Sequence, residues 1–374
     1  MVKTQIPLAK EIGRVPSMTI PLDAQQEKRF QRLMEEVVML DLHEHPMVLP
    51  ADIDDLVEYL RGDVYKWGYE AVKHGGWTAI STANILRGHV NTDDGSFIEF
   101  NDLVDEIGMM LSDLSNHGDM AVKVSNAGEI IAAKEQGKVG FLPTVEHLAI
   151  GSDLHRVDML HAMGIRLAGI TYNKRNYIGD GLYERTDSGL SDFGVEVVRR
   201  MNDLGMAIDL SHAGLRTALD AIELSKAPVV YSHNCSYTLR PIRRSRKDEE
   251  LVACAKKGGL IGITAVPNLL SDDPKQDIYC VLDHYDYMVK LVGIDHVGIG
   301  TDTLIGDHVG FHRKMLLGLG LLPNDLPAPY LNGLESPADG KNIIRGLIAR
   351  GYPDEQITKI AGRNALEYLR RVMS

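Results

Sequence analysis

Short apolar runs alternate with longer amphipathic stretches along most of the chain. The apolar runs are rich in β-branched residues and stay apolar throughout, rather than on every second position. Strands of this kind are typical of a parallel sheet, because helices cover both of its faces. The eight runs lie at 37–45, 78–86, 138–146, 165–172, 207–212, 228–233, 260–266 and 296–302.

The stretches between these runs carry the signals of helices. Residues 192–205 and 213–227 have apolar side chains at spacings of three and four, with Gly or Pro at or beside their ends. A further amphipathic helix is expected at about 24–36, ahead of the first strand. Eight strands that alternate with helices are what a closed parallel barrel requires.

We therefore expect the α/β class, with a TIM-type (β/α)8 barrel and extra helices at the N- and C-termini. No internal repeat, low-complexity tract or linker divides the sequence, so residues 1–374 are interpreted as one domain. In this interpretation residues 1–36 form an N-terminal extension and 37–302 carry the barrel strands. Residues 303–374 contain the last crossover and the C-terminal helices.

Five of the apolar runs end in side chains that bind metal ions. A single histidine after an apolar run is usually an ordinary loop residue, but parallel barrels gather such strand ends at one mouth. Imidazole and carboxylate are ligands that zinc prefers, and this set is large enough for two divalent ions, with Zn²⁺ as the expected metal. The ligand-type residues are His43, His45, Glu146, His212, His233 and Asp302.

The spacing of the first three suggests how they act. His43 and His45 are two residues apart at the end of a strand, so both side chains point to the same side and can bind one ion. Glu146 closes its strand and can bridge two ions, since each carboxylate oxygen can bind one. Its neighbour His147 either lines the pocket or caps a helix.

The later residues complete the predicted centre. His212 and His233 each follow a serine, in DLSH and VYSH, and are expected to bind the second ion. Asp302 either binds metal or holds the attacking water and passes its proton to a leaving amine. Two neighbouring ions would activate a shared water and polarise a carbonyl, so the chemistry indicated is hydrolysis.

The composition limits the classes of binding partner and the cellular compartment that we expect. The net charge is −12, with acidic and basic residues mixed along the chain, which disfavours nucleic acid and anionic membranes as partners. Three cysteines in no CxxC arrangement argue against a disulfide framework. The N-terminus has no apolar signal-peptide region and no run of eighteen apolar residues occurs, so we expect a cytoplasmic, soluble enzyme that acts on a small molecule.

Several longer stretches resemble the membrane (renal-type) dipeptidase family, zinc peptidases of the amidohydrolase superfamily. The stretches that carry the resemblance are 164–181, 189–214, 228–244, 296–302 and 351–372, for example GLSDFGVEVVRRMNDLGMAIDLSHAG in the middle of the chain. The resemblance implies a binuclear zinc barrel, usually a homodimer, that hydrolyses dipeptides, including those with a D-residue at the C-terminal position.

Carried over position by position, the resemblance gives each residue a role. It implies that His43 binds the first metal, that Glu146 bridges, and that His212 and His233 bind the second metal. It also implies that Asp302 transfers the proton.

The resemblance assigns the substrate's terminal carboxylate to Arg244, eleven residues after His233. A guanidinium suits this task, because its fork donates two parallel hydrogen bonds to a carboxylate. Arg240, Arg243 and Arg246 are close enough in sequence to be alternatives.

Two positions depart from the family pattern. The family has HxD where this chain has His45, which replaces an anionic ligand by a neutral one and raises the net charge of the site by one unit. Tyr172 stands where the family commonly has a histidine that contacts the tetrahedral intermediate. We assign Tyr172 to catalysis and substrate binding, because a phenol can donate a hydrogen bond to an oxyanion, although it carries no positive charge at pH 7.

The predicted function is hydrolysis of the amide bond of dipeptides by a metal-activated hydroxide. An alternative, favoured by His45 and Tyr172, is an amidohydrolase for N-acyl amino acids, cyclic amides or lactones. A third is a barrel that binds metal without catalysis. Residues 304–332 are expected to fold over the mouth of the barrel, to lie at a dimer contact, or to pack on the outside of the barrel. Residues 62–77 either form a wall of the substrate pocket or pack on the barrel rim.

Overall fold

The computed structural model describes residues 6–62, 64–90, 98–315 and 326–373. Ten strands form one sheet in which every paired strand is parallel to its neighbour. In order across the sheet they are β4 (Ala121–Lys123), β5 (Val139–Leu142), β3 (Ala79–Ser81), β1 (Leu40–Asp41), β11 (Val297–Ile299), β10 (Leu260–Ile263), β9 (Val230–Asn234), β8 (Ala207–Asp209), β7 (Leu167–Gly169) and β6 (Thr144–Val145).

The sheet closes into a barrel because β5 and β6 are two halves of one apolar run. Pro143 parts them, and a proline has no N–H to donate to a ladder. The first half pairs with β3 through Phe141, and the second half pairs with β7 through Val145. Strand β6, at one end of the strand order, therefore continues directly from β5, the second strand from the other end, and the predicted β/α barrel is confirmed.

Strand β4 is an addition that the sequence pattern did not predict. It pairs only with β5, at the edge of the described sheet, and only Ala121 of its three residues is buried. The strand is short and mostly exposed, so it contains no apolar run from which the sequence could predict it.

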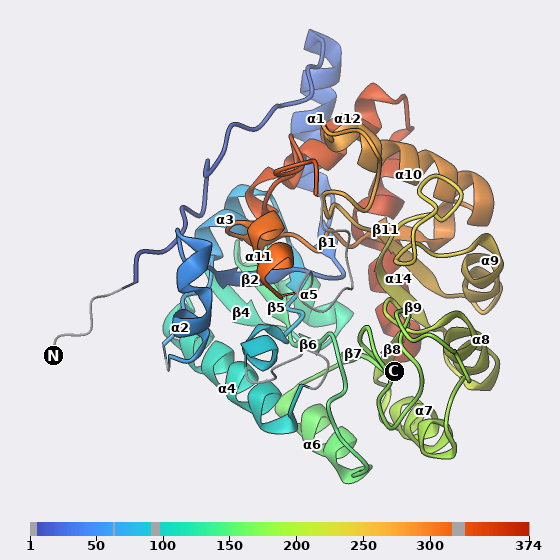
Figure 1. The fold of residues 1–374 in the computed structure, drawn as a ribbon. Coiled ribbons are helices and arrows are strands. Elements are labelled where there is room, and N and C mark those ends of the chain that lie inside the picture. The colour runs from blue at the N-terminus through green and yellow to red at the C-terminus, as the bar shows by residue number, and fades with distance from the viewer. Residues whose placement is uncertain (1–5, 63, 91–97, 316–325, 374) are drawn as a thin grey trace, which may run out of the picture.

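Helices lie around the outside of the strands (Figure 1). They are α1 (Ala24–Glu36), α2 (Leu56–Leu60), α3 (Tyr69–His74), α4 (Phe100–Asn116), α5 (Ala127–Glu135), α6 (His155–Met163), α7 (Asp192–Leu204), α8 (Leu215–Leu224), α9 (Asp248–Lys256), α10 (Ile278–Val292), α11 (His308–Met315), α12 (Lys341–Ala349), α13 (Asp354–Thr358) and α14 (Asn364–Val372). The predicted helices at 24–36, 192–205 and 213–227 are confirmed as α1, α7 and α8. No helix in the described part of the chain is long and apolar enough to cross a membrane.

Local chemistry explains where α7 begins and ends. The Ser191 side chain accepts a hydrogen bond from the Gly194 N–H and so satisfies a donor at the first turn. Gly205 ends the helix with a φ of 66°, a left-handed conformation that glycine adopts without steric cost.

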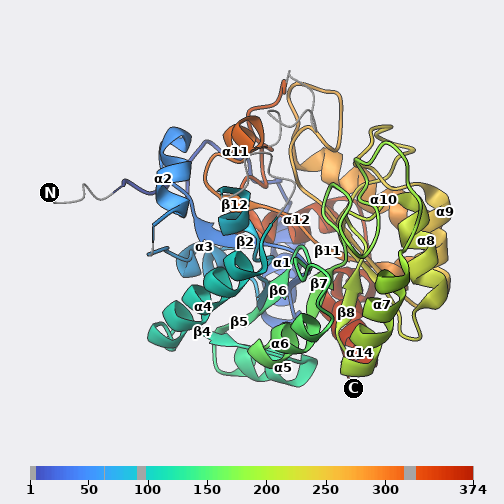
Figure 2. The same ribbon diagram turned by 60° about the horizontal axis from the view of Figure 1, so that its bottom comes forward.

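Helix α14 closes the N-terminal end of the barrel. The Asn364 side-chain amide donates to the backbone carbonyls of Ile294 and Val297, at 2.7 and 2.8 Å, where β11 begins. The Tyr368 hydroxyl donates to the Pro228 carbonyl, at 3.2 Å, just before β9. Figure 2 shows α14 and α11 at opposite ends of the strands, so the C-terminal ends of the strands are left for a site.

Two glycines leave room inside the barrel for the backbone of β9. A Cβ atom on Gly300 would lie 1.7 Å from the carbonyl oxygen of Ser232, and one on Gly262 would lie 2.0 Å from the same oxygen. Both distances are far inside van der Waals contact, and Ser232 directly precedes His233. The glycines therefore fix the position of one candidate metal ligand.

We predict that Gly300→Ala lowers the free energy of unfolding by about 1–3 kcal/mol, because overpacking a closed barrel forces its backbone to shift. Chemical denaturation of the purified variant measures the loss. Gly108→Ala is the matched control, since nothing lies within 4 Å of a Cβ at this helical position and alanine favours a helix. Equal stability of the Gly300→Ala variant and the unsubstituted protein would contradict the packing role.

Candidate metal centre

All six predicted ligand-type residues meet at the C-terminal ends of the barrel strands. They are buried, apart from Asp302, whose side chain is 13% exposed. His43 lies between β1 and β2 (His45–Val48), His45 begins β2, Glu146 follows β6, His212 follows β8, His233 lies in β9, and Asp302 follows β11. Strand β2 pairs with β12 (Leu304–Ile305) in a separate two-stranded sheet that joins the first and last strand ends.

Glu146 lies between two pairs of histidines. Its Oε1 atom is 2.9 Å from Nε2 of His212 and 3.6 Å from Nε2 of His233. Its Oε2 atom is 3.6 Å from Nε2 of His45 and 3.8 Å from Nε2 of His43. Each carboxylate oxygen therefore faces one pair of imidazoles, which is the arrangement of a carboxylate that bridges two cations.

Asp302 belongs to the first histidine pair. Its Oδ1 atom is 3.2 Å from Nε2 of His45 and 3.7 Å from Nε2 of His43. Its φ of 54° is left-handed, which costs a non-glycine residue about 1 kcal/mol or more, and its N–H donates to the His43 carbonyl at 2.8 Å. Burial alone would raise the pKa of Asp302, but the His45 hydrogen bond and the His43 imidazole hold it below its usual range.

The charge state of these groups fits a cation. Burial lowers the pKa of His43 to about 3 and holds that of His233 well below its usual value, so both imidazoles are neutral and keep a lone pair for a metal. Burial also raises the pKa of Glu146 to about 8, because a carboxylate buried there lacks a full counter-charge. The His43 Nε2 atom is buried and has no hydrogen-bond partner among the described residues. These residues therefore fit divalent metal ions.

A buried hydroxyl orients one histidine of each pair. Ser232 Oγ donates to Oδ2 of Asp209 at 2.5 Å, and it lies 2.8 Å from Nδ1 of His233 and 3.3 Å from Nδ1 of His43. Because the hydroxyl has one hydrogen and gives it to the carboxylate, both imidazoles must donate from Nδ1. Their Nε2 lone pairs are then directed toward Glu146. Hydrogen-bond partners of this kind commonly fix the tautomer and the ring orientation of histidines that bind a metal ion.

The second serine of the repeated Ser-His endings supports the same carboxylate. Ser211 Oγ donates to Oδ1 of Asp209 at 2.7 Å, and the Ser232 N–H donates to that oxygen at 3.0 Å. Sequence reasoning noted the DLSH and VYSH endings but assigned only their histidines. Asp209, Ser211 and Ser232, which lie beside these histidines in the sequence, were the available signal for the orienting group.

A further carboxylate holds the first histidine pair. Asp41 Oδ1 accepts from the His43 N–H at 3.0 Å, and its Oδ2 accepts from the Thr301 hydroxyl at 2.5 Å. Burial raises the pKa of Asp41 to about 7. Glu44, between the two histidines, accepts from the Thr303 hydroxyl at 2.5 Å. The carboxylates in DLHEH thus tie the first strand to the last, which sequence reasoning missed.

Of the four candidate arginines, the structure places Arg244 in the metal pocket. It is buried, and its Nη2 atom donates to the His233 carbonyl at 3.1 Å and lies 3.3 Å from Nε2 of His212. The other three face different partners: Arg240 pairs with Asp272, Arg243 donates to the carbonyls of Leu182 and Glu184, and Arg246 pairs with Glu250.

Tyr172 and α11 form other walls of this pocket. The Tyr172 ring stacks on His212, with centroids 4.4 Å apart and planes 22° apart. His308, Phe311 and His312 of α11 line the same pocket. The described part of segment 304–332 that contains α11 thus folds over the mouth, while residues 316–325 lie outside the described residues. Sequence reasoning missed both α11 histidines, although their spacing of four on a helix was a usable signal.

The segment 62–77 has a packing role. Trp67 and Trp77 are both buried in the core, and the Trp77 indole N–H donates to the Pro337 carbonyl at 2.8 Å. Neither tryptophan lines the metal pocket. The positions of both tryptophans agree with the interpretation in which this segment packs on the barrel rim, and not with the one in which it walls the substrate pocket.

We predict that Ser232→Ala weakens metal binding by about 10- to 100-fold, because His43 and His233 lose the partner that fixes their tautomer. Metal titration of the metal-free protein measures the affinity, and the ¹⁵N shifts of the two imidazoles report the tautomers without any turnover. Ser225→Ala is the control, since Ser225 is also buried but bonds to Asn202 and Ala227, away from the site. Unchanged affinity and unchanged shifts in Ser232→Ala would exclude the orienting role.

Two curated fungal proteins are similar to this chain. The chain is 28% identical over 275 residues to dipeptidase tcpJ of Claviceps purpurea, which covers 72% of this chain and 60% of that protein. It is 29% identical over 283 residues to dipeptidase ataJ of Aspergillus terreus, which covers 69% of this chain and 64% of that protein. The matched region thus spans about three fifths of the length of these relatives.

Solved structures share the fold over nearly the whole chain. An amidohydrolase from Pseudomonas aeruginosa superposes with a TM-score of 0.78 at 27% identity, covering 92% of this chain and 99% of that chain. The probable dipeptidase PvdM from the same organism gives a TM-score of 0.75 at 20% identity, covering 94% and 99%.

The sequence also matches a family profile over most of its length. Residues 27–314 match the membrane dipeptidase profile, peptidase family M19. This match includes all six ligand-type residues, Arg244 and Tyr172, and it confirms the resemblance found in the sequence. Since the matched region is well over half of the chain, the chain belongs to the membrane dipeptidase family, peptidase family M19.

Proposed function

We propose that this protein is a metal-dependent dipeptidase that hydrolyses the amide bond between two amino-acid residues. The observation that carries the proposal is the position of Glu146, whose two oxygens face two separate histidine pairs. The Arg244 guanidinium lines the same small pocket. A centre for water activation thus lies beside a group that binds a carboxylate.

The proposed cofactors are two divalent ions, with zinc as the expected metal because its usual ligands are imidazole and carboxylate. His43 and His45 would hold one ion, and His212 and His233 the other, with Glu146 shared. Bound there, the ions would make water more acidic and polarise the scissile carbonyl.

The chain's own residues supply orientation and proton transfer. Arg244 pairs with the terminal carboxylate of the substrate and so fixes which amide lies over the centre. Burial raises the pKa of Tyr172 well above its usual value, so its phenol stays protonated and can donate a hydrogen bond to a developing oxyanion. Asp302 takes the proton from the attacking water and gives it to the leaving amine.

The preferred substrate is a small dipeptide with a free C-terminal carboxylate. The free space at the centre is about 40 Å³, which suits small side chains beside the metal ligands. A metallopeptidase from Rhodobacter sphaeroides, 20% identical with a TM-score of 0.69, carries a phosphinate mimic of L-Ala-D-Ala. That ligand is the reason to include dipeptides with a C-terminal D-residue in the assay.

The alternative of an N-acyl amino acid as substrate uses the same centre, since it also has an amide and a free carboxylate. Cyclic amides and lactones, by contrast, need have no carboxylate to pair with Arg244. A barrel without catalysis would bind metal but show no turnover. Hydrolysis assays with and without a chelator separate these alternatives.

Two further features are part of the proposal. A homodimer is expected from the family resemblance, and sedimentation velocity measures it. A cytoplasmic location is expected from the sparse cysteines, of which Cys235 and Cys254 are buried and Cys280 is partly exposed, all as free thiols. Fractionation of the source cells measures the location.

We predict that Arg244→Ala raises KM about 100-fold for a free-acid dipeptide but has little effect on the matching carboxyamide, because only the acid forms the charged pair. Steady-state kinetics on the two substrates measure this difference. Arg243→Ala is the matched control, since Arg243 bonds to backbone carbonyls outside the metal pocket. Equal losses on both substrates would exclude a carboxylate clamp.

We predict that Asp302→Asn keeps its bound metal but loses about 100- to 10,000-fold in kcat, because an amide does not accept a proton at neutral pH. Metal content per chain and single-turnover rates are measured on the same sample. Loss of one ion per chain would assign Asp302 to metal binding instead. Full kcat would rule out proton transfer.

A further inference from the structure

Helix α11 carries two histidines to which no role has been assigned above. His308 and His312 are four residues apart, so their side chains lie on the same face of the helix. Their ring centroids are 4.5 Å apart. Both side chains line the metal pocket, which Asp302 lines as well. A further pair of imidazoles is thus placed beside the predicted metal centre.

These two imidazoles have no polar partner in the described part of the chain. His308 is 6% exposed, and its Nδ1 atom is buried without a hydrogen-bond partner. His312 is half-buried, and neither ring forms a hydrogen bond or an ion pair with another described residue. A buried polar nitrogen that lacks a partner is unfavourable. The arrangement therefore indicates a ligand that supplies the missing partner.

The two imidazoles are in the protonation state that binds metal ions. Burial lowers the pKa of His312 to about 4 and holds the pKa of His308 well below its usual value, so both rings are neutral at pH 7 and keep a lone pair. The negative charge of Asp302 acts in the opposite sense, because it favours a positive charge beside both rings. Neutral nitrogen donors beside a carboxylate suit a cation.

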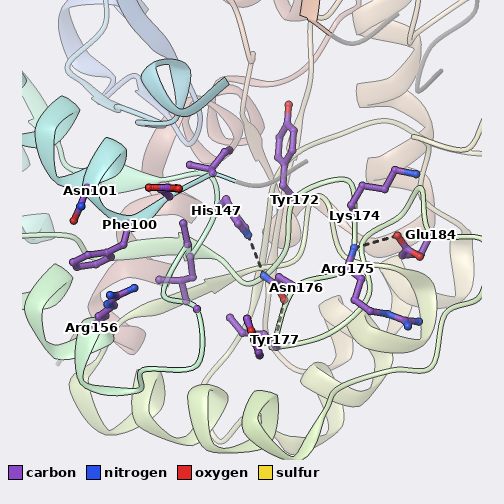
Figure 3. Close-up of a pocket in the computed structure, with 16 residues that line it drawn as sticks. Phe100, Asn101, His147, Arg156, Tyr172, Lys174, Arg175, Asn176, Tyr177 and Glu184 are labelled. Atoms are coloured by element: carbon purple, nitrogen blue, oxygen red, sulfur yellow. Dashed lines mark hydrogen bonds between the residues drawn. The ribbon is translucent and has the colours of Figure 1, made fainter. Parts of the chain in front are cut away.

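Helix α11 lies across the barrel from the larger cavity that adjoins the metal pocket. Tyr172, which follows β7, also lines this cavity of about 1170 Å³, and Figure 3 shows it there together with His147. Helix α11 follows β11 and β12, and three strands (β8, β9 and β10) lie between β7 and β11 in the sheet. With β5 and β6 counted as one strand and β4 left out, the barrel has eight strands, so this separation is half of its circumference. A ligand on α11 would therefore leave the larger cavity open.

The metal pocket itself is small enough for one added ion to fill it. Its free volume is about 40 Å³, which is room for only a few water molecules. Two histidines leave the remaining coordination positions of a zinc ion to water or to another ligand. An ion on α11, together with its waters, would occupy the space in which the scissile amide has to lie. The ion and the substrate would therefore exclude each other.

We propose that His308 and His312 form an inhibitory binding site for an additional divalent ion of the zinc type. Two histidines at a spacing of four on a helix are a pattern that binds zinc. The site has two protein ligands, whereas each ion beside Glu146 would have two histidines and a carboxylate oxygen. It therefore binds zinc more weakly and fills after the centre. The inhibition rests on the proposed dipeptidase function, but the site itself does not.

Zinc binding at rising free zinc tests the site directly. Equilibrium dialysis of the purified protein, followed by metal analysis, measures the ions bound per chain. We expect two ions at low free zinc and a third as the buffered concentration rises to about 100 µM. Anomalous diffraction at the zinc edge, from crystals soaked in the same excess of zinc, should add a peak beside His308 and His312.

Variants of α11 identify the residues that hold the third ion. His308→Ala and His312→Ala should each keep two ions and bind the third about tenfold or more weakly, since even the loss of a ligand's hydrogen-bond partner has an effect of that size. The double variant His312→Ala, Arg313→His should not restore binding, because position 313 lies on another face of the helix. His155→Ala is the matched control, since His155 is an exposed histidine in the first turn of α6, and this variant should bind three ions.

Kinetics test whether the third ion inhibits. Hydrolysis of alanyl-alanine is measured on protein that already holds two zinc ions, and each variant is compared with its own rate without added zinc. In the unsubstituted protein added zinc should raise KM and leave kcat unchanged, because the ion and the substrate compete for the same space. His312→Ala should need about tenfold more zinc for the same inhibition. Magnesium is the control ion, since it prefers oxygen ligands and should not inhibit.

The binding and kinetic results separate this site from the proposed function. If alanyl-alanine is not hydrolysed, the dipeptidase function fails, and dialysis still decides whether the third ion binds. Two ions per chain at every zinc concentration, or a third ion that all variants bind equally, would exclude the site. A third ion that leaves KM unchanged, or equal inhibition of the unsubstituted protein and His312→Ala, would exclude its inhibitory role.

Discussion

Burial of the Glu146 carboxylate among four imidazoles is the constraint on which the rest of the site depends. A buried carboxylate without a counter-charge is strongly unfavourable, and the pKa of Glu146 is accordingly raised to about 8. Cations between the carboxylate and the histidines would remove this penalty. The surrounding structure keeps the ligands in position for them: Asp209 and Ser232 set the tautomers, Asp41 holds the first strand end, and Gly300 leaves room for β9.

The same constraint explains how two departures from the family pattern can coexist. His45 replaces an anionic ligand and makes the centre more positive by one unit, and it lies 3.2 Å from Asp302 as that carboxylate's nearest imidazole. Tyr172 replaces a side chain that could carry positive charge, but its phenol still offers a donor beside His212. The two changes alter the net charge of the centre in opposite directions. The residues of the centre therefore remain compatible with hydrolysis.

Much of this arrangement could be predicted from the sequence, because each ligand-type residue ends an apolar run and parallel barrels bring such ends together. Strand β4 could not, since only Ala121 of its residues is buried. The role of Ser232 depends on His43, 189 residues away, approaching its hydroxyl across the barrel. The position of His308 and His312 depends on the path of the last crossover, which no local pattern determines.

The most direct test of the account is anomalous diffraction at the zinc edge from crystals of the metal-loaded protein. We expect two peaks, one on each side of the Glu146 carboxylate, the first beside His43 and His45 and the second beside His212 and His233. A single peak, or ions bound elsewhere while the imidazoles contact only one another, would contradict the claim that Glu146 bridges two metal ions.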